Sequence, residues 1–244
     1  MQIQVSVISK SGTRERNEDA CGYWSDGGPL CCVLSDGAGG HGGGDIASKT
    51  AVQAVLSSFE QHPEASSARV LELIEFANQQ VVLEQVKQPD YASMRATLTV
   101  LTFDPRHRQL CWGHIGDSRL YYFRAGKVLA RTKDHSLFQS MVDAGYAVQP
   151  AHGRAPESSV LIASLGSNEG FTPDVPDGAL MVQEGDAALL CSDGFWEHFD
   201  DDLLEKMFNV SHSPQDWLAR MEGIVSAAAS PSQDNFSALA VWCS

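Results

Sequence analysis

The feature that most constrains the fold is a succession of apolar runs of strand length, many of them joined by short turns. The runs lie at Ile3–Ile8, Cys21–Trp24, Leu30–Leu34, Ala96–Phe103, Leu110–Ile115, Leu120–Phe123, Val128–Arg131, Leu180–Val182, Ala187–Cys191 and Phe236–Trp242. Turns such as 104–107 and 124–127 are too short for a crossover helix, so we expect antiparallel pairing. Leu98–Phe103 is apolar on both faces, which predicts cover on each side.

Helical periodicity occurs in pairs of segments, 44–60 with 67–86 and 202–209 with 214–229. Ser213 and Pro214 form a typical helix start, with a capping hydroxyl followed by a first-turn proline. We therefore predict an α+β fold, an α-β-β-α sandwich of two antiparallel β-sheets flanked by pairs of helices. No linker divides the chain, so we expect a single domain over residues 1–244.

Residues 145–179 are rich in Gly, Pro and Ser, and only Val160–Ala163 within them resembles a strand. A long irregular segment in a compact domain is often a functional flap. An ordinary surface excursion remains an equal alternative at this point.

The loop after Leu34 contains Gly37-x-Gly39-x-x-Gly42, the spacing of a dinucleotide-binding fingerprint. That motif needs a strand–helix–strand unit, but here a second helical pattern follows the first. Asp36, directly before the glycines, would also lie where a pyrophosphate must approach. We therefore reject a dinucleotide site, and the absence of Lys-Ser or Lys-Thr after the glycines excludes a P-loop.

Charge and composition exclude several classes of protein. There are 17 Lys and Arg residues against 31 Asp and Glu, a formal net charge of −14, which disfavours binding to nucleic acid or to anionic membranes. The six cysteines show no metal-binding spacing, so we expect buried, reduced thiols. The first residues lack the pattern of a signal peptide and no run could span a bilayer, so we expect a soluble, cytoplasmic monomer.

Aspartates recur where apolar runs end. Ser-Asp-Gly follows two runs, at Asp36 and Asp193, while Asp117 follows another run and Asp234 precedes the last one. Carboxylates gathered at one edge of a sandwich would repel one another unless cations lay among them. Oxygen ligands of this kind suit Mg²⁺ or Mn²⁺. Paired ions of this type activate water for hydrolysis, and Arg14 could bind a phosphate.

Ordered motifs along the whole chain resemble the PP2C-type (PPM) metal-dependent protein serine/threonine phosphatases, and most closely the small bacterial members. These motifs are Arg14-x-x-Asn17-Glu18-Asp19, Asp36-Gly37-x-Gly39-Gly40-His41, Gly116-Asp117-Ser118-Arg119-x-Tyr121, Asp134-His135-Ser136, Ser192-Asp193-Gly194 and Asp234-Asn235-x-Ser237. The resemblance implies the same sandwich with two Mn²⁺ or Mg²⁺ ions at one end. It also implies hydrolysis of phosphoserine and phosphothreonine in proteins by attack of a metal-activated water.

The resemblance also implies residue roles. Asp36 would bridge both ions, the Gly37 carbonyl would complete one site, and Asp193 and Asp234 would hold the other. Asp117 would serve, with Asp193, a third and weaker metal site.

For the substrate, Glu18 would orient the attacking water and Arg14 would bind the phosphoryl group. The 145–179 segment would be the family's variable flap. The implied partners are phosphorylated proteins, the substrates of a cognate serine/threonine kinase.

The sequence departs from the family in two places. Many eukaryotic members carry a histidine, the expected general acid, where this chain has Ala38. His41 lies nearby and is one candidate for that role, metal-bound water being the other. The usual Gly-Thr-Thr appears as Arg95-Ala96-Thr97, which affects local packing but removes no ligand.

Two alternative functions remain open from the sequence. One is a metal-dependent hydrolase of small phosphate esters. The other is a pseudophosphatase that only binds phosphoproteins, although no ligand aspartate is missing.

Overall fold

The computed structural model describes residues 1–38, 42–148, 160–167, 171–228 and 230–244. Its first sheet has the strand order β1-β11-β10-β7-β8 and its second the order β2-β3-β5-β6-β9, with β4 paired to β3. The first sheet comprises β1 (Ile3–Lys10), β11 (Phe236–Cys243), β10 (Ala187–Cys191), β7 (Arg119–Arg124) and β8 (Lys127–Arg131). The second comprises β2 (Asp19–Trp24), β3 (Leu30–Ala38), β4 (Arg95–Ala96), β5 (Leu98–Asp104), β6 (Gln109–Ile115) and β9 (Leu180–Met181).

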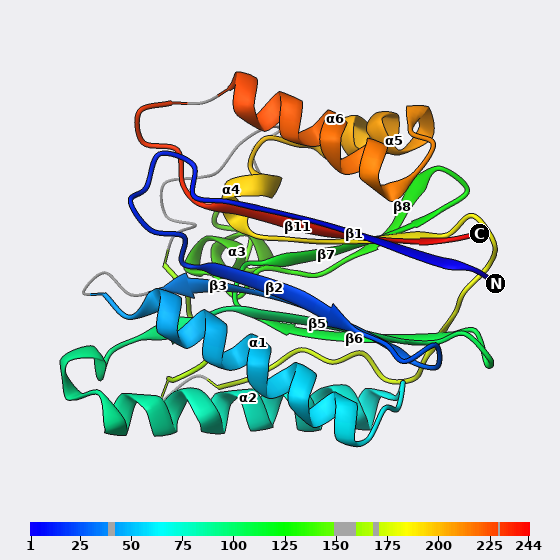
Figure 1. The fold of residues 1–244 in the computed structure, drawn as a ribbon. Coiled ribbons are helices and arrows are strands. Elements are labelled where there is room, and N and C mark those ends of the chain that lie inside the picture. Colours follow the sequence, from blue (N-terminus) through cyan, green and yellow to red (C-terminus); the bar gives the residue numbers. More distant parts are fainter. Residues whose placement is uncertain (39–41, 149–159, 168–170, 229) are drawn as a thin grey trace.

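Helices cover the outer face of each sheet (Figure 1). The second sheet is covered by α1 (Gly44–Gln61) and α2 (Ser67–Lys87), and the first by α5 (Asp201–Val210) and α6 (Pro214–Ala227). Shorter elements are α3 (Leu137–Asp143), α4 (Asp193–Trp196) and the 3₁₀ helix η1 (Pro89–Tyr91). The named strand pairs are antiparallel. The predicted α-β-β-α sandwich is therefore confirmed.

The alternation of side chains along a strand explains the layers. On β3, Val33 packs beneath α1 and α2, whereas its neighbour Leu34 packs between the sheets against residues such as Leu239. Because both faces of this strand are buried, it reads as a continuous apolar run. A third apolar layer, which includes Trp217, lies between the first sheet and α5 and α6.

Local signals set several helix starts. The Ser213 hydroxyl accepts a hydrogen bond from the Asp216 backbone N–H, with Pro214 in the first turn, as predicted. Ser66 caps α2 in the same way through the N–H of Arg69. These caps satisfy donors that the first turn of a helix leaves unpaired.

Two predicted strands differ in the structure. The run Ala96–Phe103 is interrupted at Thr97, whose N–H donates to the Asp36 carbonyl at 2.8 Å, so that β4 and β5 are separate. Val160–Ala163 forms no strand, and only Leu161 makes an isolated bridge, with Ser136. Val160 and Ile162 are exposed, so this run lacks the burial that a strand of the core would have.

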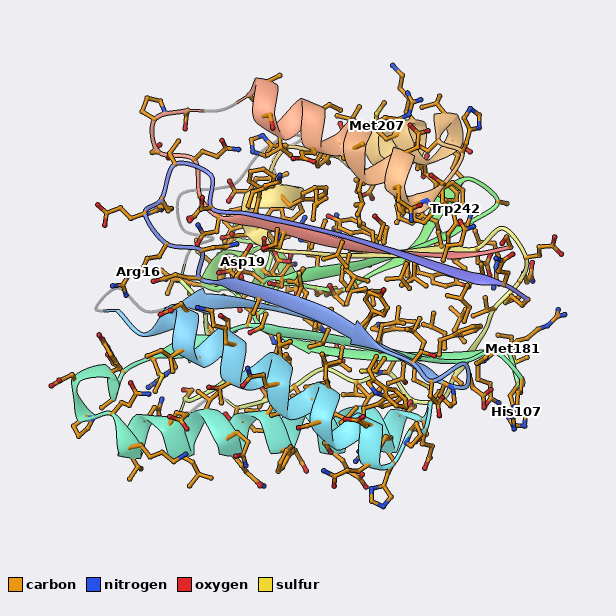
Figure 2. All side chains as sticks on the ribbon, in the orientation of Figure 1. Arg16, Asp19, His107, Met181, Met207 and Trp242 are labelled. Atoms are coloured by element: carbon orange, nitrogen blue, oxygen red, sulfur yellow. The ribbon has the colours of Figure 1, made fainter. Side chains whose placement is uncertain are left out.

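The two ends of the sandwich differ in chemistry. Both chain termini lie at one end in Figure 1, whereas the loop between β1 and β2 lies at the other. Figure 2, in the same orientation, places Arg16 and Asp19 toward that second end. The loop carries the predicted motif around Arg14 and Glu18.

None of the six cysteines is in a disulfide, and only Cys21 is partly exposed. Within the described ranges, no helix combines the length and apolar character needed to cross a bilayer.

Candidate active site

A cavity of about 500 Å³ opens at the end of the sandwich that carries the β1–β2 loop. It brings together every predicted site residue that the structure describes, and these lining residues are Arg14, Glu18, Asp36, Gly37, Asp117, Asp193 and Asp234. His41, the candidate general acid, lies outside the described residues. The predicted convergence of aspartates from distant strand ends is therefore found.

Asp36 is held in place by its neighbours on three segments. It lies near the end of β3 and is the register partner of Asp19 on β2. Its N–H donates to the Thr97 hydroxyl at 2.9 Å, which in turn contacts the Ser118 hydroxyl at 2.7 Å. Thr97, in the segment that departs from the family pattern, thus connects the Asp36 and Asp117 segments.

Gly37 allows the backbone to crowd at this point. A Cβ atom on Gly37 would lie 2.3 Å from the Gly44 carbonyl oxygen and 2.8 Å from that of Glu18. Only a residue without a side chain fits such an approach, which brings the start of α1 and the β1–β2 loop against β3.

Asp193 and Asp234 are brought together by the pairing of β10 with β11. Ser192, directly before Asp193, receives the Ser237 N–H at 2.9 Å and donates its hydroxyl to Asp19 at 2.8 Å. Gly194 lies so close to the next segment that a Cβ atom would be 2.2 Å from the Asn235 carbonyl oxygen. The Asp193 and Asp234 backbones therefore sit in a tightly packed corner.

Asn235 fixes the loop that carries Arg14 and Glu18. Its side-chain amide donates to the carbonyl oxygens of Ser11 and Arg16, both at 2.9 Å, and its side-chain oxygen accepts the Glu18 N–H at 2.8 Å. Arg14 forms an ion pair with Asp234 at 3.0 Å. The pair is half exposed and adds little stability, but it holds the guanidinium at the cavity.

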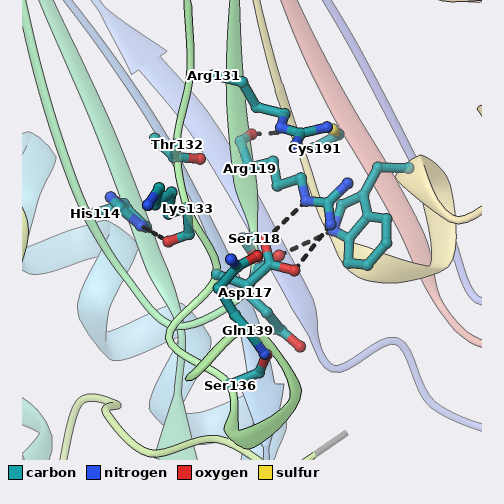
Figure 3. A network of polar contacts seen from close by, with 12 residues as sticks. His114, Asp117, Ser118, Arg119, Arg131, Thr132, Lys133, Ser136, Gln139 and Cys191 are labelled. Carbon is teal, nitrogen blue, oxygen red and sulfur yellow. Dashed lines mark hydrogen bonds and ion pairs between the residues drawn. The ribbon is translucent and has the colours of Figure 1, made fainter. Parts of the chain in front are cut away.

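Asp117 lies in the turn between β6 and β7 and is buried. The indole N–H of Trp196, on α4, donates to its carbonyl oxygen at 2.9 Å. A network of polar contacts around Asp117, Ser118 and Arg119 surrounds this turn (Figure 3). The turn is therefore shaped by contacts to α4 as well as to Thr97.

The carboxylates in this corner repel one another. Burial, and then the charges of Asp19, Asp193 and Asp117, raise the pKa of Asp36 well above its usual value. Burial raises the pKa of Asp19 to about 7, against hydrogen bonds from Ser237 and Ser192. Burial and the charges of Asp45 and Asp234 likewise raise the pKa of Glu18. The site holds more negative charge than the protein alone can balance.

The donor set fits hard divalent cations. The carboxylates and the Gly37 carbonyl supply oxygen ligands, and no cysteine or histidine is found among the described residues that line the cavity. Within the described part of the chain, no three carboxylate, imidazole or thiolate groups are near enough to close around one ion. Mg²⁺ bound to proteins usually takes only a few protein ligands and keeps several waters.

Sequence reasoning gave no role to Asp19 or Arg16. Asp19 is buried with one carboxylate oxygen unpaired among the described residues, and the other bonded to Ser192. No pattern within β2 could have found it, because its place in the site comes from its register with Asp36 on β3. Arg16 lines the cavity as a second guanidinium beside Arg14.

Comparison with known proteins agrees with this geometry. A family model described as Protein phosphatase 2C matches residues 9–228. Serine/threonine protein phosphatase PstP of Mycobacterium tuberculosis is 30% identical over 201 residues, which are 81% of this chain and 37% of PstP. The chain thus spans little more than a third of PstP.

Protein phosphatase PhpP of Streptococcus pneumoniae is 30% identical over 199 residues, 79% of this chain and 78% of PhpP. A crystal structure of the catalytic domain of PstP in complex with 2 manganese ions has a TM-score of 0.78 and 25% identity, covering 98% of this chain and 97% of that one. With the fold, the family match and these relatives in agreement, the chain belongs to the protein phosphatase 2C family.

Proposed function

We propose that this protein is a metal-dependent phosphatase that removes phosphate from phosphoserine and phosphothreonine in proteins. The observation that carries the proposal is the convergence of Asp36, Asp117, Asp193 and Asp234 in one cavity with Arg14 at its edge. All four aspartates are retained, which favours an enzyme over a pseudophosphatase. The related PstP domain is described in complex with 2 manganese ions, which supports the same metal dependence here.

The proposed metal ligands are Asp36, the Gly37 carbonyl, Asp193 and Asp234, with Asp117 and Asp193 serving a third, weaker site. Bound Mn²⁺ or Mg²⁺ would neutralise phosphate charge and lower the pKa of a coordinated water. The crowded carboxylates support this assignment, because a cation would relieve the repulsion that raises the pKa of Asp36.

The chain's own residues would bind and orient the substrate. The Arg14 guanidinium lies 3.0 Å from the Asp234 carboxylate. The oxygens of a phosphoryl group placed over the cavity could replace this carboxylate as the partner of Arg14. Glu18, whose backbone Asn235 fixes, would accept a hydrogen bond from the attacking water and so orient it. For protonation of the leaving group, His41 remains one candidate and metal-bound water the other.

We propose that residues 1–244 form one domain, supported by three apolar layers that share the two sheets. We also propose a cytoplasmic monomer, with substrates supplied by a serine/threonine kinase of the same cell. The described parts of 145–179 approach the cavity through Leu161, which supports a role for this flap in substrate choice.

The test is phosphate release from p-nitrophenyl phosphate and from phosphoserine peptides, with and without Mn²⁺. We expect Mn²⁺-dependent turnover that a chelator abolishes and that Asp193→Asn lowers by at least about 100-fold, because a metal ligand is lost. Asp90→Asn, at an exposed position in η1, is the matched control and should retain activity. Full activity of Asp193→Asn would refute the proposal, and much higher kcat/KM on small esters than on phosphopeptides would favour the small-ester alternative.

A further inference from the structure

Trp196 connects the two backbone segments that carry Asp117 and Asp193. Its indole N–H donates to the Asp117 carbonyl oxygen at 2.9 Å, and the side chain is buried. Its own backbone belongs to the short helix that begins at Asp193, where the Glu197 N–H donates to the Asp193 carbonyl at 3.1 Å. The rigid Trp196 ring therefore links the helix that begins at Asp193 to the backbone of Asp117, which is far away in the sequence.

Arg119 holds the indole ring in its orientation. The central guanidinium carbon lies 3.4 Å from the ring centroid of Trp196. The guanidinium donates two hydrogen bonds of 2.8 Å to the carboxylate of Asp134 and one of 3.0 Å to the hydroxyl of Tyr121. Figure 3 shows Arg119 beside Asp117 and Ser118, with dashed lines for the polar contacts between the residues drawn. Hydrogen bonds at its edges fix the planar guanidinium. The indole ring stacked on its face therefore has little freedom to turn.

The turn that bears Asp117 depends on such contacts for its shape. Neither β6 nor β7 includes residues 116–118, and Gly116 adopts a positive φ of 101°. Gly116 is held by two hydrogen bonds with His135, and Ser118 by the hydroxyls of Thr97 at 2.7 Å and Thr99 at 3.1 Å. At Asp117 itself the backbone carbonyl accepts the bond from Trp196. Loss of the indole bond would leave a buried carbonyl without this donor and let the Asp117 segment shift.

We propose that Trp196 is a positioning residue that sets the place of Asp117 relative to Asp193, with Arg119 fixing the indole. The inference rests on the proposed function, in which these aspartates serve the weaker metal site. Residues that orient metal ligands without touching the metal commonly change affinity by 10- to 100-fold when replaced. Trp196 therefore acts on metal affinity through the backbone of Asp117.

The first test is Trp196→Phe, which removes the N–H and keeps an aromatic face for Arg119. Isothermal titration of the metal-free protein with Mn²⁺ should show the weakest binding step lowered by roughly 10-fold or more. The matched control is Trp217→Phe, because Trp217 is fully buried and its indole N–H has no partner among the described residues. It removes the same atoms without removing a hydrogen bond, so its Mn²⁺ titration should match that of the unaltered protein.

A double-mutant cycle separates positioning from general destabilisation. If Trp196 acts through Asp117, then Trp196→Phe should change Mn²⁺ binding little further in a protein that already carries Asp117→Asn. Full additivity of the two changes would overturn the inference. So would an unchanged Mn²⁺ titration for a folded Trp196→Phe protein.

A measurement on the unaltered protein decides the matter if Trp196→Phe does not fold. In ¹H–¹⁵N spectra recorded during titration with Mg²⁺, the indole signal of Trp196 should move with the weakest step, while that of Trp217 stays in place. A Trp196 signal that ignores the titration would overturn the inference. Complete failure of the unaltered protein to bind Mn²⁺ would instead remove the proposed function, and with it the metal site on which Trp196 would act.

Discussion

At the scale of single residues, the site is built from groups that are unfavourable without a ligand. Asp36 and Asp19 are register partners on β3 and β2, so their carboxylates are forced together by strand pairing. Burial raises the pKa of both carboxyl groups; the charge of Asp19 raises that of Asp36 further, and the charge of Asp193 raises that of Asp19. Such a site trades stability for the ability to bind cations.

The first prediction is that Asp36→Asn does not destabilise the metal-free protein. The neutral amide has the same shape but removes one of the mutually repelling charges, so the free energy of unfolding in EDTA at pH 8 should equal or exceed that of the unaltered protein by about 1 kcal/mol. Chemical denaturation measures it. Asp90→Asn, in exposed η1, should change little. A loss of several kcal/mol in Asp36→Asn would show that the carboxylate is stabilising as it stands.

The second prediction compares two glycines. Gly194→Ala should lower the free energy of unfolding by about 1–3 kcal/mol and weaken Mn²⁺ binding, because its Cβ atom would lie 2.2 Å from the Asn235 carbonyl oxygen. Gly223→Ala, in the middle of α6 where a Cβ atom meets nothing within 4 Å, should instead gain up to about 1 kcal/mol through helix propensity. Denaturation and calorimetry on both variants provide the comparison. Equal effects at the two positions would contradict the tight corner that we describe.

At the scale of elements, the described parts of the 145–179 segment are tied to the sandwich through two adjacent histidines. Residue 162 donates its N–H to the His135 carbonyl at 2.9 Å, and Asp174 exchanges two backbone hydrogen bonds of 2.9 Å with His114. The two imidazole rings stack with centroids 4.6 Å apart. The stacked histidines thus join two points of the segment to β6 and to the loop between β8 and α3.

The third prediction concerns the pH dependence of this junction. Burial and the neighbouring His114 lower the pKa of His135 to about 4, against the charges of Asp174 and Asp134. Below the ordinary histidine pKa of about 6.5, this residue therefore binds more protons in the unfolded chain than in the folded one. The contribution of neutral His135 to the free energy of unfolding is fully present above pH 6.5 and is lost as the pH falls toward 4.

The comparison variant is His135→Asn, whose side-chain oxygen can still accept the Gly116 N–H that His135 receives at 3.2 Å. The stability difference between the unaltered protein and this variant should shrink by roughly 1–2 kcal/mol between pH 7 and pH 4.5, allowing for partial exposure of the ring. Denaturation in EDTA across this range measures it. His62→Asn, at an exposed position, serves as the control. A difference that is constant with pH would exclude titration of His135 as its source.

The elements also show what the sequence could and could not predict. Continuous apolar runs and long periodic segments were both predicted closely, since the run Ala187–Cys191 is β10 itself and 44–60 lies within α1. The helix α4 was missed because Asp193–Trp196 is too short for periodicity. Val160–Ala163 was wrong as a strand, because Val160 and Ile162 are exposed and only Leu161 forms an isolated bridge. Asp19 gained its importance only from the register with Asp36, which a single strand's sequence does not contain.

At the scale of the whole molecule, the cavity lies where the ends of two sheets meet. Asp36 comes from the second sheet, whereas Asp193 and Asp234 flank strands of the first. The sheets are otherwise held together by an apolar layer that includes Leu34, Leu190 and Leu239. A cation bound by carboxylates of both sheets would therefore act as a crosslink at the end of the sandwich where charge repulsion otherwise pushes them apart.

The fourth prediction follows from that crosslink. Mn²⁺ at about 100 times its dissociation constant should stabilise the folded protein by about 2.7 kcal/mol, which raises Tm by roughly 5–10 °C for a chain of this size. Hydrogen exchange should slow near the cavity in strands of both sheets, in β3 as well as in β10 and β11, because one ion restrains all of them. Asp193→Asn should lose the protection in both sheets, although the substitution lies in only one. Protection confined to β10 and β11 would mean that the ion is held by a single sheet, and the bridging role of Asp36 would then be wrong.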